Sequence, residues 1–294
     1  MRTLKLGLAL GAGGTKGAAH VGVMKVLDEA GIAVDALAGT SIGALYGAGF
    51  AAGRSPQEME DGIRSCPHLD VINFFRNRLK IRDNNRLARR FYSALAGHRI
   101  EELPVAFAAV ASDIVERCPV VIDRGPLIDA VEASIAIPFI ARPVAHQGRY
   151  LLDGGFWDSA PVDAVALLGA DVIVAVELGG PFMLPRKLRA PAAVLARFSA
   201  QVPLHRTMAG LPFAVHAVSR PGQAGRTAQV VLRPDVGRMN ANLPFHMDRA
   251  VDAGIEAARE ALPAIRALLA GEPVASVVEE FAPAPQLLAE PGTA

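Results

Sequence analysis

Short apolar runs alternate with longer segments of helical spacing along most of the chain. The apolar runs have the length of buried strands and fall at residues 4–10, 34–38, 104–113, 118–123, 150–152, 171–178 and 230–232. Helical spacing and helix-boundary residues predict helices at 16–30, 43–52, 83–96, 126–134, 162–168 and 244–269, and another beginning at 56. This alternation predicts an α/β fold, with three α/β/α layers around a largely parallel sheet.

Residues 179–228 interrupt the alternation. The segment is rich in proline and basic residues and holds one amphipathic pattern, near residues 192–201. We therefore predict a surface excursion or lid. The chain is predicted to form a single domain at 1–270, with its core at 4–178, a closing strand and helix at 229–270, and a disordered tail at 271–294.

The composition predicts a globular protein with a sizeable core, because 51% of the 294 residues are hydrophobic and 20% are charged. A formal net charge of +1 gives no electrostatic reason to expect a nucleic-acid partner. Cys66 and Cys118 lack the spacing of a metal site, so we expect no metal. The two cysteines fit buried thiols, and a disulfide between them stays an open alternative.

Two segments have features of targeting or membrane sequences. Residues 2–10 begin with basic residues, but their apolar run is short for a signal peptide. Residues 36–53 carry no charge and approach the length of a membrane span, yet they contain Thr40, Ser41 and several glycines. A buried strand followed by a buried helix explains this stretch better. We expect a soluble, cytoplasmic protein with at most peripheral membrane contact.

Ser41 is the centre of the pentapeptide Gly39-Thr-Ser-Ile-Gly43. Gly-x-Ser-x-Gly between a strand and a helix is typical of a sharp turn that exposes a serine hydroxyl. The glycines let the backbone pass through the cramped turn, and the helix N-terminus favours developing negative charge. We interpret Ser41 as a nucleophile in preference to a structural turn residue.

A glycine-rich loop at residues 11–17 precedes the serine by one helix and one strand. It matches neither the P-loop, since Lys16 precedes a glycine, nor the dinucleotide fingerprint, whose last glycine position Lys16 occupies. A set of backbone N–H groups that binds an anion remains, with a plain tight turn as the alternative. Together with an activated serine, such a loop predicts acyl transfer from an ester.

Asp153 is the candidate base. It follows a short strand and precedes Gly154 and Gly155, which permit an unusual turn and close backbone approach. A serine hydroxyl needs a base within hydrogen-bond reach to become a nucleophile. Taken alone, the tripeptide also fits an ordinary Asp-Gly turn.

Four motifs, in this order along the chain, resemble the patatin-like phospholipase family. They lie at residues 11–24, 39–45, 134–138 and 153–155. The similarity covers roughly residues 4–178 and, more loosely, the final strand and helix. The resemblance implies a patatin-like α/β hydrolase with a Ser–Asp dyad and no catalytic histidine. It also implies that phospholipids or lysophospholipids are cleaved through an acyl-serine, with neither calcium nor an organic cofactor.

The resemblance also assigns roles to single residues. Ser41 becomes the nucleophile, and Asp153 takes its proton and later activates water. The backbone amides of the oxyanion hole come from Ala12, Gly13, Gly14 and Thr15, and the remaining motif glycines are Gly17, Gly39, Gly43, Gly154 and Gly155. The apolar segment 134–138 is expected to pack near the dyad.

Two positions depart from the family pattern. Ala12 stands where glycine is usual, and it keeps its amide unless the position needs a positive φ. Lys16 stands where arginine is common, and it keeps the charge but loses the bidentate fork.

Two other interpretations stay open. A Ser-Asp-His triad would follow Ser41 and Asp153 with a later histidine, although a serine turn after only two strands argues against that fold. The candidates for the triad histidine are His205, His216 and His246. A silent lipid-binding or scaffold protein of the same fold is the second interpretation. His20 and His146 are expected to be surface or satisfied core residues.

Seven basic residues cluster in a stretch where Asp83 is the only acid. They are Arg76, Arg78, Lys80, Arg82, Arg86, Arg89 and Arg90. A solvated helix face is the favoured interpretation, and attraction to an anionic lipid surface is the functional hypothesis.

Overall fold

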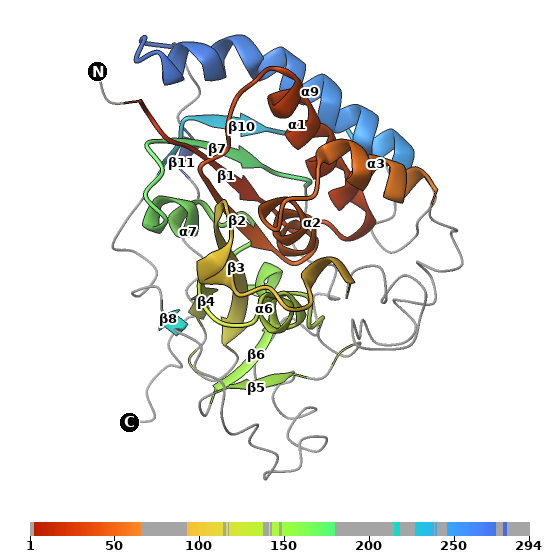
Figure 1. The fold of residues 1–294 in the computed structure, drawn as a ribbon, viewed down its shortest axis with the longest axis vertical. Coiled ribbons are helices and arrows are strands. Elements are labelled where there is room, and N and C mark those ends of the chain that lie inside the picture. Colours follow the sequence, from red (N-terminus) through yellow and green to blue (C-terminus); the bar gives the residue numbers. More distant parts are fainter. Residues whose placement is uncertain are drawn as a thin grey trace, which may run out of the picture.

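The computed structural model shows an α/β fold around one central sheet (Figure 1). The structure describes residues 3–65, 93–113, 116, 118–137, 141, 143–146, 149–179, 215–217, 227–237, 239, 246–274 and 279–280. The basic cluster, the helix predicted near 192–201, and most of the segments 83–96 and 179–228 lie outside these residues.

Nine strands of the described chain form the sheet, in the order β10-β7-β1-β2-β3-β4-β8, with β6 paired to β3 and β5 paired to β6. Their bounds are β1 Leu6–Leu10, β2 Ala36–Thr40, β3 Ala106–Asp113, β4 Cys118–Ile122, β5 Val144–His146, β6 Arg149–Asp153, β7 Val172–Val176, β8 Val215–Ala217 and β10 Val230–Leu232. The strands from β10 to β3 run parallel, whereas β4, β5, β6 and β8 pair antiparallel. The predicted parallel sheet is confirmed at its centre.

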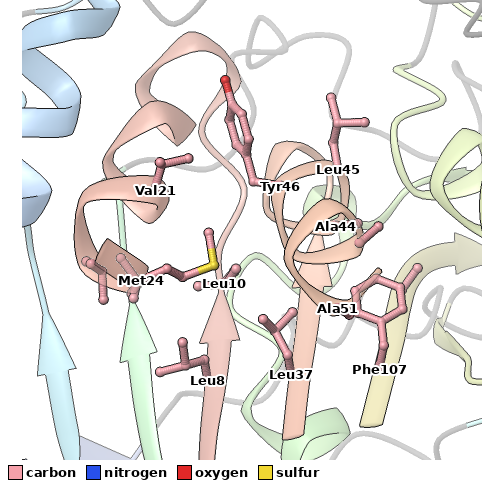
Figure 2. Close-up of a cluster of buried hydrophobic side chains, with 14 of the residues drawn as sticks. Leu8, Leu10, Val21, Met24, Leu37, Ala44, Leu45, Tyr46, Ala51 and Phe107 are labelled. Atoms are coloured by element: carbon pink, nitrogen blue, oxygen red, sulfur yellow. The ribbon is translucent and has the colours of Figure 1, made fainter. Parts of the chain in front are cut away.

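Helices cover both faces of the sheet. They are α1 Ala18–Glu29, α2 Ile42–Ala51, α3 Pro56–Arg64, α6 Leu127–Ser134, α7 Val162–Leu167 and α9 Met247–Leu269. Leu8 and Leu10 of β1 point into the large core under α1, α2 and α9, whereas Ala9 between them packs in the smaller core with α7. Figure 2 shows the larger core, where Leu37 and Phe107 continue the row across the next strands. The three-layer arrangement is therefore confirmed.

Four short strands occur where the sequence predicted none. β5 precedes β6 and pairs with it antiparallel. β8 lies within 179–228 and extends the sheet beyond β4. β9 (Thr227–Ala228) pairs antiparallel with β11 (Glu279–Glu280), which belongs to the tail predicted to be disordered. Strands of two or three residues carry too little hydrophobic pattern to be read from sequence, because their pairing partner specifies them.

The first and last described helices, α1 and α9, pack closely through two glycines. A Cβ atom on Gly22 of α1 would collide with the carbonyl oxygen of Val251, and one on Gly254 of α9 would collide with that of Ala19. Both glycines therefore serve close approach of the helix backbones. This contact brings the C-terminal helix onto the helix that follows the glycine-rich loop.

We predict that Gly254→Ala lowers stability, because the added methyl group meets backbone atoms that cannot rotate away. The free energy of unfolding should fall by about 1–3 kcal/mol and the melting temperature by about 3–10 °C. Gly62→Ala on α3 is the matched control, since its Cβ would meet open space and alanine favours the helix. Equal melting temperatures for the two variants would contradict the close helix contact.

Candidate active site

One edge of β3 carries two strands end to end. β2 pairs with residues 106–110, and β6 pairs with residues 111–113. β4 pairs with residues 109–113 and so overlaps both, which places β2 and β6 together on the opposite edge. β2 ends at Thr40 where β6, running the other way, ends at Asp153. The residues after β2 and at the end of β6, Ser41 and Asp153, therefore meet.

The turn at Ser41 has the strained geometry of a nucleophile elbow. Ser41 has φ 56° and ψ −121°, a positive φ that a non-glycine residue adopts only at a cost of about 1–3 kcal/mol. A Cβ atom on Gly39 would collide with Ala44, and one on Gly43 would collide with the carbonyl oxygen of Leu10. The glycines on both sides are thus required by space, as the sequence predicted.

Ser134 holds the backbone of the elbow. The Ser41 N–H donates to Ser134 Oγ over 2.9 Å, and the Ser134 hydroxyl donates to the carbonyl oxygen of Val110 over 2.6 Å. Ser134 ends α6 and is fully buried. One hydroxyl thus connects the elbow to β3 and satisfies a donor and an acceptor that have no access to water.

The carboxylate of Asp153 accepts two hydrogen bonds, one of them from the serine. Ser41 Oγ donates to Asp153 Oδ2 over 2.6 Å, and the Gly155 N–H donates to Oδ1 over 2.9 Å. The backbone of Asp153 is also fixed, because its N–H donates to the carbonyl oxygen of Ala136 over 2.9 Å. A Cβ on Gly154 would collide with the carbonyl oxygen of Val110, so this turn also needs glycine.

Burial decides the electrostatics of this carboxylate. Asp153 is 1% exposed, and burial raises its pKa from the ordinary 3.8 to about 6. The hydrogen bonds from Ser41 and Gly155 oppose this shift, because they favour the charged form. The carboxylate is therefore ionised near pH 7 and is a stronger base than an exposed aspartate.

The glycine-rich loop lies against the elbow. Gly14 has φ 58°, and a Cβ on Gly17 would collide with Ile42, the residue after the serine. The Ala12 N–H donates to the carbonyl oxygen of Ser159 over 2.9 Å. Of the four amides that the sequence predicted for an oxyanion hole, that of Ala12 is therefore already engaged by another residue.

The histidines named above that the structure describes lie in separate parts of the fold. His20 on α1 is fully buried, and its Nε2 lies 2.7 Å from the carbonyl oxygen of Gly11. His246 precedes α9 with φ 77°. The backbones of His146 and His216 lie in β5 and β8, whereas His205 lies outside the described residues. The sequence indicated neither the contact of His20 nor the role of Ser134, because both depend on residues far apart in the chain.

Within the described ranges, no group of three or more His, Cys, Asp and Glu side chains could hold a metal ion. No helix in the same ranges combines the length and the apolar character needed to cross a membrane.

Comparison with known proteins identifies the family. The family model described as patatin-like phospholipase matches residues 8–166, which include both members of the serine–aspartate pair and the glycine-rich loop. The chain therefore belongs to the patatin-like phospholipase family.

Curated relatives are longer than this chain. An uncharacterized NTE family protein of Mycobacterium tuberculosis is 35% identical over 179 residues, which cover 60% of this chain and 49% of the relative. A second one is 30% identical over 275 residues, covering 88% and 46%. A lysophospholipase, nte1, of Aspergillus fumigatus is 33% identical over 180 residues, covering 59% and 12%. The chain thus spans about half the length, or less, of these relatives.

A solved structure also resembles the chain. VipD from Legionella pneumophila has a TM-score of 0.48 at 16% sequence identity, with 90% of this chain and 67% of that chain covered.

We predict that Ser134→Ala weakens the elbow. The change leaves the Ser41 N–H and the Val110 carbonyl without their buried partner, so the free energy of unfolding should fall by about 1–3 kcal/mol. Ser65→Ala is the control, since Ser65 is exposed and its hydroxyl makes a long bond of 3.4 Å. Thermal unfolding of both variants measures the difference, and an unchanged melting temperature for Ser134→Ala would refute the role of this hydroxyl.

Proposed function

We propose that this domain hydrolyses carboxylic esters of lipids, with Ser41 as nucleophile and Asp153 as proton acceptor. The contact between Ser41 Oγ and Asp153 Oδ2, at 2.6 Å, carries the proposal. It joins a serine on a strained turn to a buried carboxylate whose pKa is raised to about 6. A hydroxyl in this position has both the base and the exposed geometry that nucleophilic catalysis requires.

The reaction proceeds in two halves. Asp153 accepts the hydroxyl proton while Ser41 Oγ attacks the ester carbonyl carbon, and the carbonyl oxygen becomes an oxyanion. The intermediate collapses when the C–O bond of the alcohol breaks, and the proton on Asp153 passes to the leaving alkoxide. Asp153 then takes a proton from water, which attacks the acyl-serine. The fatty acid leaves, and Ser41 regains its proton.

The oxyanion needs hydrogen-bond donors that are fixed before the reaction. We assign this role to the amides of Gly13 and Gly14, with Thr15 beside them, at the start of the turn that leads into α1. The proximity of Gly17 to Ile42 supports the assignment, because it brings the loop next to the serine. The N-terminus of α2 adds a favourable field for negative charge.

The direct contact between the two side chains favours a dyad over a triad. In a triad the imidazole stands between serine and aspartate, which requires several ångströms more than the 2.6 Å observed. His20, the histidine whose described side chain is buried near the loop, binds the carbonyl oxygen of Gly11 instead of either partner. The proposed steps accordingly use no histidine, metal or organic cofactor.

Phospholipids and lysophospholipids are the proposed substrates. Family membership supports a lipid ester, and the similarity to a fungal protein named lysophospholipase supports a single-chain lipid. Contact of the basic cluster with anionic membranes, and a cytoplasmic location, stay predictions from the sequence.

The proposed dyad gives Ser41 and Asp153 separate roles that substitutions can separate. A fluorophosphonate probe should label Ser41, as mapped by mass spectrometry, and Ser41→Ala should abolish labelling. Asp153→Asn should lower ester hydrolysis by at least about 10²–10⁴-fold, because the amide can hydrogen-bond to Ser41 but cannot accept its proton. The fold should survive, since asparagine can still accept from Gly155.

Two results would count against the dyad. Substantial hydrolysis by a folded Asp153→Asn variant would favour the histidine triad. Absence of labelling in the folded wild-type protein, with and without lipid micelles, would favour a silent lipid-binding protein of this fold.

The raised pKa of Asp153 makes both activity and stability depend on pH. Asp153 must be ionised to act, so kcat/KM should rise tenfold per pH unit up to about 6, the raised pKa of Asp153, and level off above it. Stability should change in the opposite sense. The folded pKa lies above the ordinary 3.8, so the unfolded chain binds fewer protons between these values and stability falls as pH rises from about 4 to 6.

Asp158 provides the control for this assignment. Burial also raises the pKa of Asp158 to about 6, so this carboxyl titrates in the same range. Asp158→Asn should leave the acid limb of the rate profile in place, because Asp158 does not contact Ser41. Loss of that limb in Asp158→Asn would show that the profile reports the wrong carboxylate.

A further inference from the structure

His20 makes a hydrogen bond that ordinary core packing does not require. It lies in the first turn of α1, is 0% exposed, and has its Nε2 2.7 Å from the carbonyl oxygen of Gly11. A carbonyl oxygen only accepts, so Nε2 carries the proton and Nδ1 is the bare nitrogen. Nδ1 has no hydrogen-bond partner within the described part of the chain.

This arrangement is maintained at neutral pH. Burial lowers the pKa of His20 from 6.5 to about 4, because a charged imidazole loses its hydration in the core. The ring is therefore neutral near pH 7. A buried nitrogen without a partner has a free-energy cost that an apolar side chain would avoid. The hydrogen bond to Gly11 is the feature that distinguishes histidine from such a side chain.

The carbonyl of Gly11 belongs to the same peptide unit as the N–H of Ala12. His20 holds the oxygen end of this unit, and the carbonyl oxygen of Ser159 accepts from its N–H end over 2.9 Å. The unit is planar, so two hydrogen bonds at opposite ends fix its rotation. The N–H of Gly11 is fixed as well, because it donates to the carbonyl oxygen of Val176 over 3.0 Å.

The fixed peptide is the last one before the proposed oxyanion donors. Its rotation sets the direction in which the chain enters Gly13 and Gly14. The Gly11 carbonyl oxygen also packs against α2, the helix that follows Ser41, since a Cβ on Gly43 would lie 2.9 Å from this oxygen. Rotation of this peptide would therefore displace the loop relative to Ser41.

We propose that His20 is a positioning residue for the reaction: its Nε2–H clamps the Gly11–Ala12 peptide and so aims the Gly13 and Gly14 amides at the oxyanion. The proposal rests on the function proposed above. His20 touches neither the substrate nor the reacting atoms, and it acts through the loop.

Two substitutions of similar polarity separate this role from packing. In His20→Gln the side-chain amide nitrogen lies close to the position of Nε2 and can donate to Gly11. In His20→Asn the amide lies near the position of Nδ1 and falls short of that oxygen. The Gln variant should keep kcat within about threefold of wild type, whereas the Asn variant should lose about 10–100-fold, approaching the loss of one oxyanion donor.

The loss should appear in kcat, with KM for a short soluble ester changed less than about threefold, because the oxyanion forms only after the ground state. The rate constant for fluorophosphonate labelling of Ser41 should likewise fall more in His20→Asn than in His20→Gln. Equal activity of the two variants, or a change confined to KM, would overturn the proposal.

Structural readouts make the test independent of folding defects and of the function itself. Nitrogen NMR of the wild-type protein should show His20 as the neutral Nε2–H tautomer, and an Nδ1–H tautomer would overturn the proposal. The amide resonances of Gly13 and Gly14 should shift in His20→Asn and stay near wild type in His20→Gln. A wild-type protein that neither labels nor hydrolyses esters would refute the proposed function, whereas unshifted amide resonances in a folded Asn variant would refute the clamp.

Discussion

The site depends on two strands that share one edge of β3. β2 and β6 approach each other from opposite directions along that edge, and each ends where the other ends. No loop has to reach across the fold to bring Ser41 to Asp153, because the register of the sheet already brings them together. The hydrogen bond of 2.6 Å is the consequence. The antiparallel pairing of β6 with β3, next to the parallel pairing of β2 with the same strand, thus serves the chemistry.

Holding the pair in place has a free-energy cost that the rest of the domain must offset. Ser41 adopts a strained φ. Asp153 is almost fully buried and yet carries a charge near neutral pH. Strain of this kind persists only where the surroundings over-determine it. Here Ser134 fixes the elbow amide, Ala136 fixes the Asp153 backbone, and parallel strands covered on both faces supply the core.

The residues identified the local parts of this arrangement, and the family resemblance paired Ser41 with Asp153, but neither revealed the hydrogen bonds made by Ser134 and His20. Glycines around Ser41 and Asp153 signalled tight turns, and the structure shows backbone atoms where the Cβ atoms of Gly39, Gly43 and Gly154 would lie. The α/β alternation likewise predicted the parallel centre. Ser134 and His20 were not predicted to hold other residues in place, since a hydroxyl or an imidazole in a helix carries no sign of its partner. The pairings of β5 with β6, β8 with β4 and β9 with β11 were missed because strands of two or three residues have no periodicity of their own.

The matched family region and the C-terminal helix are physically linked through α1. Its inner side presents His20 to the Gly11 carbonyl, and two residues later Gly22 lets the backbone of α9 approach. α9 lies outside residues 8–166, yet it packs on the helix that holds the glycine-rich loop. Residues 8–166 contain every group that the proposed reaction uses, but the rigidity of α1 comes partly from beyond them. A fragment ending at residue 166 would therefore keep the reacting groups and lose a support of the loop that positions the oxyanion.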